Sequence, residues 1–203
     1  MLPAATAAAV EDLAAFGRFA AARGWVPATA GNFSRRLDAR HALITRSGAD
    51  KGALDAAALA VAALDGPLPP GLSAEAPLHL ARYATDAAIG AVFHVHTVAA
   101  TVMSRRDLAA GAVRTEDYEM HKGLAGIASH ETAVEIPVFA NDQDTQALAR
   151  RVEERIGAGA RVPGFLLAGH GLYAWGADAR EARRHLETLE FLLACHLAER
   201  SLR

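Results

Sequence analysis

Two histidines separated by a single residue, His94 and His96, end an apolar run and are the first candidates for chemistry in this sequence. The run, residues 89–96, predicts a β-strand, on which side chains two positions apart point to the same face. Two imidazoles that converge in this way can bind a metal ion. The same motif also occurs by chance among structural or surface histidines, so on its own it leaves both interpretations open.

A third histidine, His170, stands between Gly169 and Gly171, in a predicted turn between strands at 162–168 and 172–175. Glycines let the backbone turn sharply and present the side chain between them. A turn histidine can instead cap a neighbouring carbonyl. Taken together, the three imidazoles predict a site with three protein ligands and one open position, which is how catalytic zinc is usually held. Three imidazoles also suit iron, cobalt or nickel.

Two glutamates, Glu75 and Glu119, are the candidates for acid/base catalysis. Glu75 opens the predicted helix that precedes the histidine strand, and Glu119 lies in a predicted short helix at 116–124. An isolated glutamate is ordinarily a solvated surface charge. Nothing in the local sequence of either residue separates it from that alternative.

Three turn-like segments could bind a phosphate group: Gly31-Asn32, Ser47-Gly48 and Ser73-Ala74. Backbone N–H groups at turns and helix starts form anion sites, and Lys51 could add a positive charge. Each segment is equally compatible with an ordinary turn. The sequence has no Walker loop and no GxGxxG motif after a strand, so it gives little support to nucleotide binding.

The elements that must position these residues alternate along the chain. Apolar spacing predicts helices at 10–23, 73–85, 97–106, 116–124, 146–156 and 178–200, and strands at 41–45, 89–96, 134–139, 162–168 and 172–175. The last two strands are joined by so few residues that they must pair antiparallel. We therefore expect one α/β domain over residues 1–203, with a mixed, mainly antiparallel sheet flanked by helices, and frayed residues at 1–9.

Composition narrows the classes of partner. The 203 residues carry a formal net charge of −2 without a basic stripe, which argues against nucleic acid. The single cysteine, Cys195, excludes an internal disulfide and fits a reducing compartment. The N-terminal segment does not read as a signal peptide, and no apolar run approaches the roughly 20 residues of a membrane span. We expect a cytoplasmic protein without a membrane partner.

The remaining histidines have no defensible partner spacing, although His121 neighbours Glu119 and could enter a site. The others are interpreted as structural or surface residues: His41, His79, His130, His185 and His196.

An ordered set of motifs resembles the class II aldolase/adducin family over about residues 10–199. The set is TAGNFS at 29–34, ITRSG at 44–48, SAE at 73–75, HVH at 94–96 and GHG at 169–171. The resemblance implies an α/β/α fold and one zinc ion on His94, His96 and His170. It also implies phosphate bound around Asn32, Ser47, Gly48 and Ser73, and a ring, commonly a tetramer, with sites near subunit boundaries. Ala30 and Ala74 depart from the family, because relatives carry hydroxyl residues there.

Further segments resemble the dehydratase branch of this family: residues 46–52, 118–120, 122–123, 141–144 and 171–176. That branch implies loss of water from 5-methylthioribulose 1-phosphate in methionine salvage, with Glu119 as the acid/base. Glu75 matches the acid/base position of the aldolases. A sugar-phosphate aldolase or epimerase would use the same ligands, and is the first alternative. A non-catalytic, adducin-like scaffold is the second alternative, because such proteins share the fold without needing the metal ligands.

Overall fold

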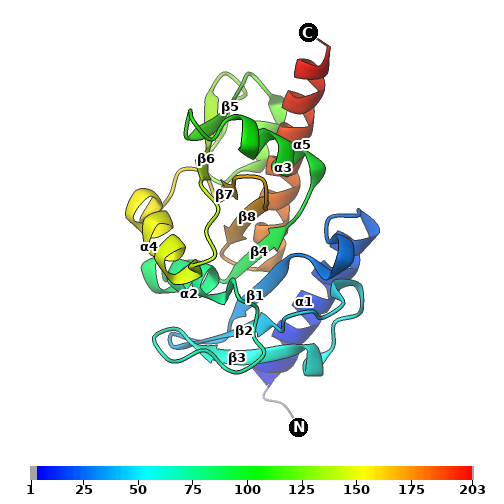
Figure 1. The fold of residues 1–203 in the computed structure, drawn as a ribbon, viewed down its shortest axis with the longest axis vertical. Helices are drawn as coiled ribbons and strands as arrows, with labels where there is room; N and C mark the ends of the chain where they lie inside the picture. The colour runs from blue at the N-terminus through cyan, green and yellow to red at the C-terminus, as the bar shows by residue number, and fades with distance from the viewer. Residues whose placement is uncertain (1–3, 203) are drawn as a thin grey trace.

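The computed structural model describes residues 4–202, in which eight strands form one sheet (Figure 1). The strand order is β3-β2-β1-β4-β8-β7-β6-β5. Only β6 and β7 pair parallel among these described strands, and every other neighbouring pair is antiparallel. The prediction of a mixed, mainly antiparallel sheet is confirmed. The strands are β1 (Asn32–Arg36), β2 (His41–Thr45), β3 (Leu59–Ala63), β4 (Ala91–Val95), β5 (Ala112–Glu116), β6 (Ala133–Phe139), β7 (Gly164–Leu167) and β8 (Gly171–Gly176).

Helices cover both faces of this sheet and create two separate hydrophobic cores (Figure 1). One core is formed with α1, α3 and α5, and the other with α2 and α4. The α-helices are α1 (Ala4–Ala22), α2 (Ala76–Thr85), α3 (Val98–Arg106), α4 (Thr145–Ile156) and α5 (Ala179–Ser201). Short 3-10 helices are η1 (Pro27–Thr29), η2 (Lys51–Ala53), η3 (Ala56–Ala58) and η4 (Glu119–Gly123).

The alternation of side chains on β4 and β1 decides which face carries the polar residues. Phe93 and Phe33 both belong to the core under α1, where Phe16 stacks on Phe93 with ring centroids 3.8 Å apart. Neighbours in sequence point to the opposite face. His94 and its register partner Asn32 therefore lie side by side on the face that α2 covers. This places the imidazole of His94 under the start of α2.

The structure differs from the sequence predictions at two helix starts. α1 already begins at Ala4, whereas we expected frayed residues up to position 9; Ala9 is buried, and alanine is the strongest helix former. Residues 1–3 lie outside the described part of the chain. α2 has Glu75 as its N-cap, whereas Ser73 was predicted there. Ser73 instead accepts a hydrogen bond from the Glu75 backbone N–H at 3.3 Å.

None of the helices within residues 4–202 is both long enough and apolar enough to cross a membrane.

Candidate metal centre

Four side chains, Glu75, His94, His96 and His170, bring one ligand atom each into a compact cluster. These four atoms all lie within 4.8 Å of one another. The three histidines predicted as ligands are thus brought together, and Glu75 joins them. His94 is fully buried, and Glu75 and His170 are each 17% exposed, so the cluster lies at the edge of the interior.

The turn between β7 and β8 brings His170 to the end of β4, and glycine makes the approach possible. A Cβ atom on Gly171 would lie 2.3 Å from the Val95 carbonyl oxygen and 2.9 Å from His94 Cε1. Gly169 has a φ of +67°, which side chains rarely adopt. The GHG motif therefore lets the turn sit directly against the imidazole of His94.

Hydrogen bonds on the far side of two rings turn their Nε2 atoms toward the cluster. His94 Nδ1 donates to the Leu172 carbonyl at 3.1 Å, and His170 Nδ1 lies 3.2 Å from Asn141 Oδ1. A ring that donates through Nδ1 presents the lone pair of Nε2 on its other side. This is the arrangement that fixes histidine ligands at metal sites.

Burial keeps two of the imidazoles neutral. It lowers the pKa of His94 well below its ordinary value, although Glu75 opposes the effect. Burial likewise lowers the pKa of His96 to about 4, with a further contribution from the neighbouring His170. Burial raises the pKa of Glu75, but His94, His170 and the Asn32 amide lower it by more. The cluster therefore combines neutral imidazoles with a carboxylate, the states in which these groups bind metals.

The donor set fits a divalent metal ion. His94 Nε2 lies 2.9 Å from His96 Nε2, and His170 Nε2 lies 3.0 Å from Glu75 Oε1. Lone pairs that face one another at these distances repel unless a proton or a cation lies between them. Imidazole nitrogen and carboxylate oxygen are both common ligands of zinc and similar ions. Glu75, His94, His96 and His170 could thus hold one such ion.

One cavity of about 310 Å³ connects this cluster with the predicted phosphate loops. Glu75, His96 and His170 line it. The residues proposed from sequence for phosphate line it as well: Asn32, Ser47, Gly48, Lys51 and Ser73. Candidate metal ligands and candidate anion donors therefore share one pocket, from segments more than 100 residues apart in the chain.

The positive charge in this pocket comes from Lys51 and Arg46, both of which line it. Lys51 is buried, and its Nζ donates to the Thr29 carbonyl at 2.6 Å and to the Ala49 carbonyl at 2.8 Å. Burial lowers the pKa of Lys51 from its ordinary value, against Asp50 and Glu75, which raise it. Two carbonyl acceptors leave one of the three ammonium protons for an anion.

Within one chain, Glu119 lies outside this pocket. Its side chain is 71% exposed on η4, where it accepts a hydrogen bond from Lys122 at 2.7 Å. That bond lowers the pKa of Glu119, whereas an acid that protonates a leaving group works best with a raised pKa. Among the described residues, those that line the pocket do not include Glu119.

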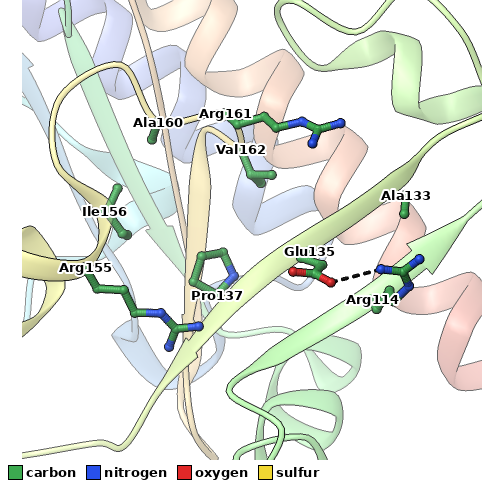
Figure 2. A pocket seen from close by; sticks show the side chains of 9 residues that line it. All are labelled: Arg114, Ala133, Glu135, Pro137, Arg155, Ile156, Ala160, Arg161 and Val162. Carbon is green, nitrogen blue, oxygen red and sulfur yellow. Dashed lines mark hydrogen bonds and ion pairs between the residues drawn. The ribbon is translucent and has the colours of Figure 1, made fainter.

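Figure 2 shows a second pocket, lined by Arg114, Arg155 and Arg161 beside Glu135. Its arginines already have partners: Arg114 bonds Glu135 at 3.0 Å, and Arg155 donates to the Val138 carbonyl at 3.2 Å. The cluster that could hold a metal opens into the pocket lined by Ser47 and Lys51, so the candidate site is placed there.

Two pocket residues were missed from sequence. Asn141 lies against His170, and Arg46 lines the pocket; from sequence both belong to segments that resemble the family, but neither was predicted as a site residue. The signal for Asn141 was weak, since it follows β6 by two residues and gains its role only because β6 pairs with β7, which leads into the His170 turn.

Comparison with known proteins identifies the family of this chain. The family of class II aldolase and adducin N-terminal domains matches residues 11–197. A methylthioribulose-1-phosphate dehydratase of Parvibaculum lavamentivorans is 50% identical over 197 residues, which are 97% of either chain. The enzyme of the same name from Bradyrhizobium sp. is 52% identical over 91% of this chain and 88% of its own. The crystal structure of L-fuculose-1-phosphate aldolase from Thermus thermophilus superposes with a TM-score of 0.77 at 30% identity, covering 95% of both chains. On sequence and fold alike, this chain belongs to the class II aldolase and adducin family.

Proposed function

We propose that this chain removes water from 5-methylthioribulose 1-phosphate to give 2,3-diketo-5-methylthiopentyl 1-phosphate, a step of methionine salvage. Relatives that are about half identical over nearly the full length carry the name of this dehydratase. The observation that carries the proposal is the shared pocket, in which His96, His170 and Glu75 meet Ser47 and Lys51. Such a pocket suits a small ketose with a phosphate at one end.

Zinc is the proposed metal, held by His94, His96 and His170 with Glu75 beside them. A bound zinc ion supplies Lewis acidity toward a substrate carbonyl, which makes the neighbouring C–H more acidic. The protein's contribution is to present three imidazoles at one point, two of which, His94 and His170, are held from behind by the Leu172 carbonyl and by Asn141.

The reaction needs one group to remove the C3 proton and one to protonate the departing C4 hydroxyl. Loss of both leaves a C3 enol, which becomes the second ketone when a proton adds at C4. Glu75 is the proposed base, and its carboxylate, which lines the pocket beside the histidines, supports this role. Glu119 remains the proposed acid, and Glu119 acting in both steps is the alternative.

The proposed role of Glu119 requires a second subunit. Within one chain this carboxylate is exposed on η4, whereas a protein that assembles as a ring, here proposed to be a tetramer, can carry it into a neighbour's pocket. Isologous or cyclic contacts repeat such an arrangement at every site. Burial in that contact would also raise the pKa that Lys122 now lowers. We further propose that the protein is cytoplasmic and that the tetramer forms there.

Phosphate binding in this pocket would supply affinity remote from the reacting carbons. Ser47, Gly48 and Lys51 line the pocket, and their contacts can be used to place C3 beside the base. The hydroxyls absent at Ala30 and Ala74 leave these positions with backbone groups alone.

The test is the identity of the product. Purified protein is incubated with 5-methylthioribulose 1-phosphate, and the products are separated by mass. A product lighter by one water supports the dehydratase. Cleavage between C3 and C4, which gives two fragments, would instead support the aldolase alternative on the same site.

A further inference from the structure

A row of buried polar side chains leads away from Glu75 beneath α2. Asn32 Nδ2 donates to Glu75 Oε2, and His79 Nε2 lies 2.5 Å from Asn32 Oδ1. On the other side of the ring, His79 Nδ1 lies 2.7 Å from Ser34 Oγ, which lies 2.8 Å from the Tyr83 hydroxyl. His79 and Ser34 are fully buried, and Asn32 and Tyr83 are nearly so.

The sequence makes this row possible by two periodicities. Glu75, His79 and Tyr83 are four residues apart, so on α2 and its N-cap they lie along one side. Asn32 and Ser34 are two apart on β1 and point to the face that α2 covers. From sequence alone, His79 is interpreted as a structural or surface histidine.

The direction of every hydrogen bond follows from the carboxylate at one end. A carboxylate accepts only, so Asn32 must turn its NH₂ toward Glu75 and its Oδ1 toward His79. Oδ1 also accepts only, so His79 must carry its proton on Nε2. A neutral ring then accepts at Nδ1, so Ser34 donates to His79 and accepts from Tyr83.

We propose that His79 is a positioning residue: its Nε2–H fixes the Asn32 amide, whose N–H in turn holds Glu75 Oε2 and leaves Oε1 facing His170. The effect on catalysis rests on the proposed function of Glu75. These bonds use one N–H and the Oδ1 of the Asn32 amide, so the second N–H and the backbone remain for phosphate at this position.

The proposal predicts a kcat effect rather than a KM effect. His79→Leu removes the donor, so the amide and the carboxylate lose their fixed orientation while Ser47, Gly48 and Lys51 stay in place. We expect kcat to fall by about 10- to 100-fold, the usual scale for partners behind a site residue, with KM nearly unchanged. His79→Gln carries an N–H at about the place of Nε2 and should recover most of kcat.

Two controls separate positioning from stability. Leu193→Ala, a core change in α5, shows what lost stability alone does to kcat. In addition, ¹⁵N NMR of histidine-labelled wild-type protein reports the tautomer of His79, assigned by loss of its signals in His79→Gln. This measurement needs no substrate, so it tests the bond chain even if the proposed reaction is wrong.

We expect a neutral His79 with its proton on Nε2, together with the loss in His79→Leu and the recovery in His79→Gln. A proton on Nδ1, a charged ring, or a His79→Leu protein that turns over as fast as Leu193→Ala would overturn the proposal. Equal loss in His79→Gln and His79→Leu would do the same.

Discussion

Glu75 Oε1 lies 3.0 Å from His170 Nε2, although the two residues are 95 positions apart in sequence. The contact joins the start of α2 to the turn between β7 and β8, and it places a carboxylate against an imidazole whose other nitrogen faces Asn141. The site therefore combines three histidines with one carboxylate that lines the same pocket.

Replacing this carboxylate should stop turnover without removing the metal. Glu75→Gln keeps the shape but cannot take a proton, so we expect kcat to fall by at least about 10²-fold. Three histidines remain, which suffices for zinc. Steady-state kinetics with metal analysis checks this, with Glu135→Gln at an exposed position of β6 as the matched control. A Glu75→Gln protein with near-normal kcat would contradict the role of Glu75 as the base.

A single methyl group at Gly171 should disturb the cluster. The added Cβ would lie 2.3 Å from the Val95 carbonyl oxygen and 2.9 Å from His94 Cε1, so the turn or the ring must move. Disturbing the groups that hold a metal-ligating histidine in position typically lowers metal affinity by about 10- to 100-fold. We expect Gly171→Ala to bind zinc more weakly than wild type in chelator competition. Unchanged affinity would mean that the approach of the turn does not position His94.

Mixed oligomers test whether Glu119 acts across a subunit boundary. Glu119→Gln and His96→Ala should each be inactive alone, since each site lacks either the acid or a ligand. Refolded together in equal amounts, they should regain about one quarter of wild-type activity, because half of the clusters and half of the neighbouring glutamates are intact.

The control for this mixture is Glu75→Gln with His96→Ala. Both residues belong to the cluster of one chain, so no combination of these subunits restores an intact site. Recovery in this control, or none with Glu119→Gln, would refute action in trans.

The buried ring of His79 should make stability depend on pH. Burial lowers its pKa to about 4 from an ordinary 6.5, so between these values the unfolded chain binds more protons than the folded chain. Stability must then fall as the pH falls through this window, by up to about 1.4 kcal/mol per pH unit from this group. The loss levels off below the folded-state pKa.

Urea unfolding at pH 7 and pH 5.5, at one protein concentration and with chelator present, measures this term. The decrease in the free energy of unfolding should be smaller in His79→Gln than in wild type. Equal decreases would show that His79 titrates normally.

Much of the site was accessible from sequence because its residues obey simple periodicities. His94 on β4 and His96 directly after it lie two positions apart and meet at one point, and the flanking glycines predicted the His170 turn. The hydrogen bonds that link Glu75 to His79 through Asn32 were not predictable from sequence. They depend on how α2 packs against β1, and no local pattern encodes that contact.

Two sheet edges were missed for a physical reason. β3 is made largely of alanine, which favours helices, and β5 alternates buried Val113 and Thr115 with charged Arg114 and Glu116 over only five residues. Edge strands of this kind gain their stability from pairing with β2 and β6. Their own sequences therefore give little indication of a strand.

The most direct test of the whole account measures metal content and dehydration together, in wild type and in His96→Ala, before and after chelation and zinc restoration. His41→Ala, which removes an exposed histidine paired with Asp38, is the control. We predict about one zinc ion per wild-type chain, with water loss from 5-methylthioribulose 1-phosphate that the chelator abolishes and zinc restores, and neither metal nor activity in His96→Ala. Full metal content in His96→Ala, or dehydration that survives complete removal of the metal, would contradict it.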